Sequence, residues 1–209
     1  MTTSAAPIAA FDFDGTLTTG DCMMPFLRRV AGTRRVATAV ARIVPLAARR
    51  ERDAAKAQLL AELLSGVAVA AAADTGERFA SEIVARRLRR DTVSRLRWHQ
   101  SRGHRTVIVS ASLRPYLQPV AAHLGVDHVI CTELGETEGR YTGRILDGNC
   151  RGPAKADRLL AWAGVMPGEL WAYGDSAGDA ELLALAHHAE RLGRRRTIAA
   201  HPPATAVAS

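Results

Sequence analysis

The sequence predicts an α/β fold: a parallel sheet with helices on both faces, interrupted after its first strand by a helical insertion. Short apolar runs alternate with helical patterns along the chain, as strands and helices do around a parallel sheet. About ninety residues without a strand signal separate the first two runs, which is too long for one crossover connection. The insertion is therefore expected to be a separate helical unit.

Each predicted strand is a short run of apolar or β-branched residues. Strands are expected at residues 8–13, 106–109, 129–131 and 170–173. The first run leads into Asp12, Asp14 and Gly15, the pattern of a buried strand entering a turn. The second ends at Ser110, and the fourth is followed by Asp175.

Helical patterns fill the intervals between these strands. Helices are expected at residues 91–102, 115–124, 154–163 and 179–186. Residues 22–97 are predicted to form several helices, with breaks at Gly32, Pro45, Gly66 and Gly76. We assign residues 19–86 to a helical cap, and residues 1–18 and 87–209 to the core domain. Residues 133–145 are typical of a β-hairpin, and the chain from Arg191 predicts a last edge strand with a frayed end.

Composition narrows the class of partner. The 209 residues include 28 basic and 21 acidic residues, a formal charge of +7, which favours anionic partners such as phosphoesters or acidic lipid headgroups. Nucleic acid is disfavoured, because no aromatic residues are interleaved with the basic ones to stack on bases. Cys22, Cys131 and Cys150 lack paired spacing, which indicates reduced thiols and a cytoplasmic protein. Neither a signal peptide nor a membrane-spanning stretch is expected.

Four polar elements are predicted to meet at the carboxyl edge of the sheet, where ligands bind in open α/β folds. They are DFDGT at residues 12–16, Ser110, Lys155 at a helix start, and GDSAGD at residues 174–179. Each alone has an ordinary structural explanation, such as a turn, a strand-end cap or a solvated lysine. Together, in this order, they indicate a catalytic site.

These motifs resemble those of the haloacid dehalogenase superfamily. The stretches DFDGTLT, RWHQSRGH, VIVSAS, NCRGPAK and YGDSAGD are similar to subfamily IB, the phosphoserine-phosphatase-like branch, and within it to a phosphatidylglycerophosphatase C-like subgroup. The resemblance covers about residues 8–188. It implies a Rossmann-like core with a C1-type helical cap, and a Mg²⁺-dependent phosphomonoester hydrolase.

The resemblance also implies roles for individual residues. Asp12 would attack phosphorus and form an aspartyl-phosphate, which splits a slow displacement into two easier steps. Asp14 would act as general acid and then base, while Ser110 and Lys155 would bind phosphoryl oxygens. The implied Mg²⁺ ligands are Asp12, Asp175 and the main-chain carbonyl of Asp14, with Asp179 in a supporting role.

Three further residues are expected to contact substrate: Gly15, Ala111 and Asp21. Gly15 permits a sharp turn that lets the backbone approach the phosphoryl group. Ala111 replaces a glycine common in the family, but its N–H is retained. Asp21 has a second interpretation as the N-cap of the first cap helix. Gly178 departs from the family pattern, in which an asparagine often supports the metal.

The substrate class stays open between a small phosphorylated metabolite and a phosphatidylglycerophosphate-like lipid. Eight arginines lie in residues 28–52, and they favour extra negative charge on the substrate, contact with an anionic membrane, or simply a solvated helix face. The arginines of greatest interest are Arg28, Arg29, Arg34, Arg35 and Arg42. The alternatives are a phosphomutase or phosphotransferase of the same fold, and a non-catalytic regulatory binding protein. The oligomeric state is open.

Overall fold

A six-stranded sheet forms the centre of the molecule. The computed structural model describes residues 6–164, 168–193 and 197–202. Within them the strands are β1 (Ile8–Phe11), β2 (Arg105–Leu113), β3 (His128–Thr137), β4 (Arg140–Leu146), β5 (Leu170–Gly174) and β6 (His188–Arg191). Their order across the sheet is β4-β3-β2-β1-β5-β6, and every pair is parallel except β3 with β4. β1 is therefore flanked on both sides.

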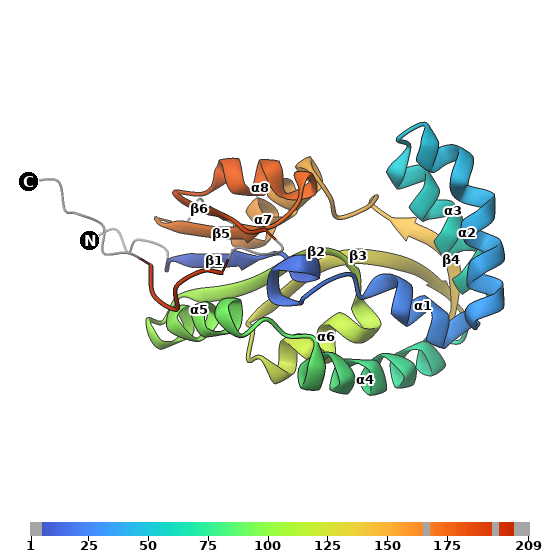
Figure 1. Ribbon diagram of the computed structural model, residues 1–209, viewed down its shortest axis with the longest axis horizontal. Helices are drawn as coiled ribbons and strands as arrows, with labels where there is room; N and C mark the ends of the chain where they lie inside the picture. The colour runs from blue at the N-terminus through green and yellow to red at the C-terminus, as the bar shows by residue number, and fades with distance from the viewer. Residues whose placement is uncertain (1–5, 165–167, 194–196, 203–209) are drawn as a thin grey trace, which may run out of the picture.

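Helices cover both faces of this sheet, which confirms the predicted fold class. On one face lie α4 (Val69–Arg86), α5 (Arg90–Ser101) and α6 (Arg114–His123); on the other lie α7 (Pro153–Ala163) and α8 (Ala180–Leu185) (Figure 1). Successive strand residues point to opposite faces. In β1, Ala9 and Phe11 accordingly pack in the larger core beneath α5 and α6, while Ile8 and Ala10 pack in the smaller one.

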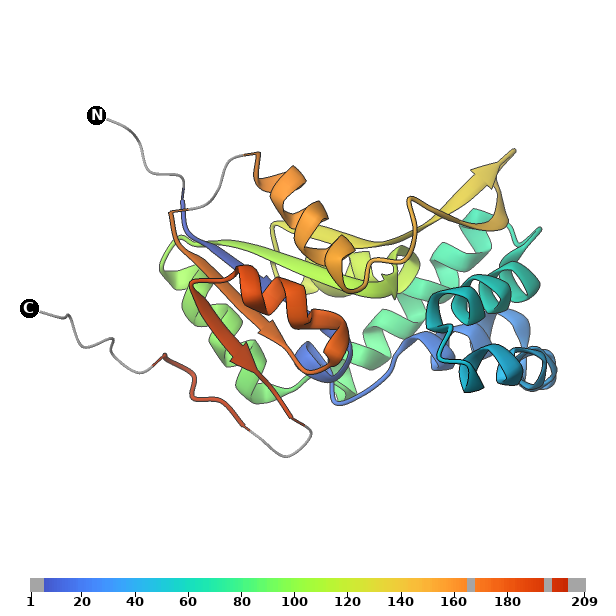
Figure 2. The same cartoon turned by 90° about the horizontal axis from the view of Figure 1, so that it is seen from above.

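The insertion after β1 begins as three helices beyond the carboxyl ends of the strands. These are α1 (Met23–Ala31), α2 (Thr33–Ala48) and α3 (Arg52–Leu64), which lie beside the β3–β4 hairpin in Figure 2. Gly143 of β4 permits this packing, since a Cβ there would lie 2.7 Å from the Cα of Ala61 in α3. The fourth inserted helix, α4, instead runs back along α6 (Figure 1).

Two of the four predicted helix breaks are wrong. Gly32 and Gly66 do separate helices, but Pro45 lies inside α2 and Gly76 inside α4. Pro45 is in the last turn of α2, so few helical hydrogen bonds follow the one that it removes. Gly76 serves close packing: a Cβ there would lie 2.1 Å from the main-chain oxygen of Pro115, at the start of α6.

The predicted hairpin is present, with Glu138 and Gly139 at positive φ in the turn. The predicted edge strand ends at Arg191 rather than beginning there, because β6 pairs with β5 over residues 188–191. After it, buried Arg95 of α5 donates hydrogen bonds to the main-chain oxygens of Ala199 and Ala200. The expected frayed end, from residue 203, lies outside the described residues. Among those described, no helix combines the length and apolar character needed to span a membrane.

Candidate active site

The carboxyl end of β1 turns sharply to present Asp12. The Asp12 N–H donates to the main-chain oxygen of Tyr173 in β5, at 2.9 Å, so the ends of these two strands are held together. Gly15 follows with φ at +82°, and a Cβ there would lie 2.1 Å from Asp175 Oδ2. Glycine is thus required both by the backbone conformation and by the carboxylate that approaches it.

Lys155 joins the two buried carboxylates of the site. Its Nζ donates to Asp12 Oδ1 at 2.6 Å and to Asp179 Oδ1 at 2.5 Å, and all three side chains are buried. Burial acts to lower the pKa of Lys155, but the two carboxylates outweigh it and raise that pKa. Burial raises the pKa of Asp12 to about 6, against the opposing charge of Lys155. The lysine therefore favours the ionised carboxylate that a nucleophile requires.

Asp14 has different partners from Asp12, although only one residue separates them. Its Oδ2 accepts from the hydroxyl of Ser112 at 2.5 Å, and its Oδ1 accepts from the main-chain N–H of Cys22 at 2.8 Å. Burial raises the pKa of Asp14 to about 7, although the Ser112 hydrogen bond opposes the rise. A carboxyl group with such a pKa suits general acid–base work near neutral pH.

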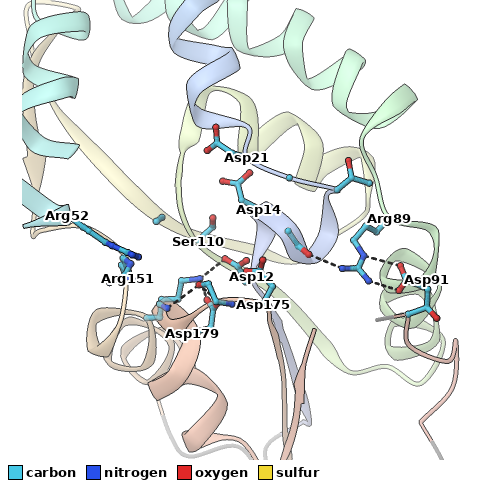
Figure 3. A pocket seen from close by; sticks show the side chains of 18 residues that line it. Asp12, Asp14, Asp21, Arg52, Arg89, Asp91, Ser110, Arg151, Asp175 and Asp179 are labelled. Atoms are coloured by element: carbon cyan, nitrogen blue, oxygen red, sulfur yellow. Dashed lines mark hydrogen bonds and ion pairs between the residues drawn. The ribbon is translucent and has the colours of Figure 1, made fainter. Parts of the chain in front are cut away.

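One cavity of about 670 Å³ collects every residue that the sequence predicted for the site. Figure 3 shows it from close by, with Asp12, Asp175 and Asp179 grouped together and Asp14 set apart from them. The predicted residues that line it are Asp12, Asp14, Gly15, Asp21, Ser110, Ala111, Lys155, Asp175 and Asp179. Their proximity is a property of the structure, whereas their individual roles stay predictions.

Ser110, Asp21 and Ala111, three other predicted residues that line the cavity, have different hydrogen-bond partners. Ser110, at the end of the buried part of β2, accepts a hydrogen bond from the Ser112 N–H at 3.0 Å. Asp21 accepts from the Met24 N–H at 3.0 Å with Oδ2, the N-cap contact considered from the sequence, and it lines the cavity as well. The main-chain oxygen of Ala111 accepts from Lys56 of α3.

Several functional candidates were missed from the sequence. Ser112 belongs to the quoted stretch VIVSAS but was not singled out. Arg52, Arg89 and Arg151 line the cavity, whereas the five cap arginines of greatest interest do not appear among its lining residues. Arg29 and Arg42 are instead paired with Glu82 and Glu62. No spacing rule identifies such arginines, because three different segments of the chain supply them.

Three carboxylates fit a divalent cation. Asp12, Asp175 and Asp179 each offer an oxygen, and the three oxygens lie within 4.8 Å of one another. An oxygen-only set of carboxylates is the donor chemistry that Mg²⁺ prefers. Both Asp179 oxygens accept hydrogen bonds, from Lys155 and from Ser176, as both Asp12 oxygens do from Lys155 and Thr16. Asp14 contributes no carboxylate to this group.

Comparisons with known proteins agree with this geometry. Residues 9–184 match the family model described as haloacid dehalogenase-like hydrolase. The chain is 36% identical over 184 residues to Protein CicA of Caulobacter vibrioides, covering 86% of this chain and 82% of that protein. It is 31% identical over 183 residues to phosphoserine phosphatase SerB2 of Mycobacterium tuberculosis, of which it spans 42%.

Solved structures share the fold. A protein of unknown function from Bordetella pertussis Tohama I is 27% identical with a TM-score of 0.74, and the match covers 88% of each chain. A structure of phosphoserine phosphatase with an analogue of its phospho-aspartyl intermediate has a TM-score of 0.56 at 17% identity, over 88% of this chain and 84% of that one. The protein is thus an enzyme of the haloacid dehalogenase-like hydrolase family, a phosphoserine-phosphatase-like member of it and a homologue of CicA.

Proposed function

We propose that this enzyme hydrolyses phosphomonoesters through a covalent intermediate on Asp12. One observation carries the proposal: two carboxylates follow one strand, and each has the environment that its role needs. Asp12 is held by the ammonium of Lys155, whereas Asp14 is held by a hydroxyl and a main-chain N–H. The first arrangement favours an ionised nucleophile, and the second a carboxyl group able to exchange a proton.

In the first step, a carboxylate oxygen of Asp12 bonds to phosphorus as the ester bond breaks, and Asp14 gives its proton to the leaving oxygen. In the second, water bonds to phosphorus, its proton passes to Asp14, and Asp12 is released. Ser110 and Lys155 supply a hydroxyl and a positive charge to the phosphoryl oxygens. The substrate contacts include Gly15, Ala111 and Asp21.

The acidic group supports Mg²⁺ as the cofactor. Asp12, Asp175 and the main-chain carbonyl of Asp14 would hold it, and Asp179 would steady Asp175. When bound, the cation offsets the repulsion between the phosphate dianion and the carboxylates. Residues 19–86 form the proposed cap over this site, where a lid excludes water during phosphoryl transfer.

The test measures phosphate release from a panel of phosphoesters, with Mg²⁺ or with EDTA. We expect turnover that EDTA abolishes, and none in Asp12→Asn. Asp157→Asn is the matched control, since Asp157 is exposed on α7 and outside the cavity. Near-normal turnover in Asp12→Asn would show that water attacks phosphorus directly. Loss of free phosphate with transfer to an added alcohol would favour a phosphotransferase.

A phosphatidylglycerophosphate-like lipid is one of two substrate classes within this proposal. Helix α2 supports it, because Arg34, Arg35 and Arg42 are exposed along it and Val44 is 57% exposed. A basic face with exposed apolar residues suits an anionic membrane surface. A small cytoplasmic phosphoester is the rival class, and the buried free thiols of Cys22, Cys131 and Cys150 support a reducing compartment.

Vesicle sedimentation separates these two classes. If the substrate is a lipid, the enzyme should sediment with anionic but not neutral vesicles, less so as salt rises, and Arg34→Glu should weaken the binding. Turnover of soluble phosphoesters without any binding to anionic vesicles at low salt would contradict the lipid class.

A further inference from the structure

Two cations in the active-site cavity have no partner among the described residues. Among the residues that the structure describes, four basic side chains line it: Arg52, Arg89, Arg151 and Lys155. Lys155 bonds Asp12 and Asp179, and Arg89 pairs with Asp91 and donates to the main-chain oxygen of Gly15. Within residues 6–164, 168–193 and 197–202, no hydrogen bond or ion pair engages the guanidinium of Arg52 or of Arg151. Two positive charges are therefore available to a ligand.

The two arginines come from different segments of the chain. Arg52 is the first residue of α3, and Arg151 lies in the loop before α7. In the view of Figure 3 both side chains extend into the same side of the cavity, away from the Arg89–Asp91 pair. Both also line a smaller adjoining cavity of about 240 Å³, together with Asp14 and Asp21. They thus lie on the side of Asp14, which faces the leaving group in the proposed reaction.

The position of Arg151 depends on Gly178. A Cβ at Gly178 would lie 3.0 Å from both Cγ and Nε of Arg151, so the arginine packs directly over this glycine. Gly178 is the position at which the family resemblance leads one to expect an asparagine. In this chain the side chain is absent, and the space is occupied by a guanidinium.

The carboxylates near this pair are already engaged. Asp53 accepts from Asn149 Nδ2 at 2.7 Å, and Asp21 caps the first turn of α1. Two guanidinium groups that line the same part of a cavity repel one another, and an anion bound between them offsets that repulsion. Their planar arrays of donors match carboxylate and phosphate oxygens in pairs. The arrangement is therefore suited to an anionic group of the ligand.

We propose that Arg52 and Arg151 form a second anion subsite, which selects phosphomonoesters whose leaving group carries a carboxylate or a further phosphate. The proposal rests on the proposed function for the position of the first phosphate. The second anionic group belongs either to a small soluble substrate or to a lipid headgroup, because both can carry carboxylate or phosphate oxygens.

The first experiment measures binding without turnover. Calorimetry with Mg²⁺ compares methylphosphonate with phosphonoacetate, 3-phosphonopropionate and 4-phosphonobutyrate, which place a carboxylate at increasing distances. The tightest of the three should bind the wild type at least about tenfold more tightly than methylphosphonate, the effect of one charge-assisted hydrogen bond. In Arg52→Gln and in Arg151→Gln this ratio should fall toward one.

The control is Arg49→Gln, an exposed arginine three positions away in the chain that lines neither cavity. Its ratio should equal that of the wild type. A wild-type ratio near one, or equal ratios in all variants, overturns the subsite, as does a failure of every phosphonate to bind. If the ratio behaves as expected but no phosphomonoester is hydrolysed, the proposed function fails while the subsite stands.

A kinetic arm distinguishes the two sources of the second anion. It compares kcat/KM for phosphatidylglycerophosphate in mixed micelles with kcat/KM for its deacylated, water-soluble headgroup. The kcat/KM values for both substrates should fall about tenfold or more in Arg151→Gln if the subsite binds the second phosphate. A higher wild-type value for the micelles identifies the lipid, and a higher value for the free headgroup identifies the soluble substrate. No fall with either substrate contradicts the subsite.

Discussion

At the scale of single residues, the DxD pair shows how environment divides labour between two identical side chains. Asp12 is buried and Asp14 half-buried, and removal from water is the largest influence raising the pKa of each. What differs is the partner: an ammonium for Asp12, and a hydroxyl with a main-chain N–H for Asp14. The ammonium stabilises charge, whereas the hydroxyl fixes the direction in which Asp14 holds its proton.

Ser112→Ala tests that positioning role. Loss of the hydroxyl should leave Asp14 in place but poorly oriented, because only the Cys22 N–H would still hold it. We expect kcat/KM for an alkyl phosphate, which needs its leaving oxygen protonated, to fall about tenfold or more. For p-nitrophenyl phosphate, whose leaving group needs little protonation, the fall should be much smaller. Steady-state kinetics on both substrates measures the difference.

Ser94→Ala on α5 is the control, because Ser94 is exposed and outside the cavity. An equal proportional loss on both substrates would mean that Ser112 acts on the whole site rather than on the acid.

The sequence was enough to predict the site residues that lie at the carboxyl end of a strand. It was not enough to predict the residues that reach the active site only because of how the chain folds. Asp12, Ser110 and Asp175 were found because the carboxyl ends of parallel strands meet at one edge. Arg52 and Arg151 were missed because a guanidinium in an arginine-rich chain carries no signal of its own. Their relevance depends on which side of α3 faces the cavity, and on the space left open above Gly178.

At the scale of elements, helix α3 is tied to the core by the half-buried ammonium of Lys56. Lys56 Nζ donates to the main-chain oxygen of Ala111, to Thr132 Oγ1 and to Asn149 Oδ1, at 2.5, 3.1 and 2.6 Å. These acceptors belong to β2, to β3 and to the loop after β4. Because α3 also carries Arg52, this contact helps to fix the proposed anion subsite.

Lys56→Met should lower the free energy of unfolding by about 2 kcal/mol, within the range for hydrogen bonds to a charged group. It should also raise KM for substrates with a second anion, since Arg52 would lose its support. Urea denaturation and steady-state kinetics measure the two effects. Gln58→Met, an exposed position on the same helix, is the control.

Unchanged stability in Lys56→Met would show that the cost of burying the ammonium cancels its hydrogen bonds. Burial indeed lowers the pKa of Lys56 to about 8, so this cost is real.

The errors at this scale concern where helices end, not which segments form helices or strands. The parallel sheet, the hairpin and a helical insertion were predicted correctly, because periodicity reports burial on one face of an element. Gly76 and Pro45 were wrongly predicted to end helices, because glycine and proline also occur inside helices. Gly76 permits close packing of α4 on α6, which depends on a neighbour far away in the sequence. No local pattern contains that information.

At the scale of the whole molecule, a buried polar cluster joins α5, the sheet and the C-terminal segment on the face opposite α7. His99 lies at its centre, with Nε2 at 2.8 Å from the Tyr173 hydroxyl and Nδ1 at 2.9 Å from His104 Nδ1. Arg95 donates to the same hydroxyl and to the main chain of Ala199. This cluster could not be predicted from the sequence, because Tyr173 and Ala199 lie far along the chain from Arg95 and His99.

This cluster makes stability depend on pH. Burial, with smaller contributions from the neighbouring charges of His104, Arg95 and His188, lowers the pKa of His99 from 6.5 to about 3. The unfolded chain therefore binds the His99 proton before the folded chain does. Stability should be fully present above pH 6.5 and decline as the pH falls toward 3, with a contribution from this residue of up to about 1.4 kcal/mol per pH unit.

Urea denaturation of wild type and His99→Gln at intervals between pH 7.5 and pH 5 measures this effect, above the range in which most carboxylates titrate. The variant keeps a hydrogen-bonding group at residue 99 but cannot take up a proton, so its stability should decline less steeply with falling pH, whatever its stability at pH 7.5.

His123→Gln, at an exposed position at the end of α6, should follow the wild-type curve. Parallel curves for wild type and His99→Gln would mean that His99 is protonated in the folded protein. In that case the polar cluster would have to provide an acceptor for the extra proton, and the Tyr173 hydroxyl, which already accepts from Arg95, would be the nearest group to His99 Nε2 able to do so.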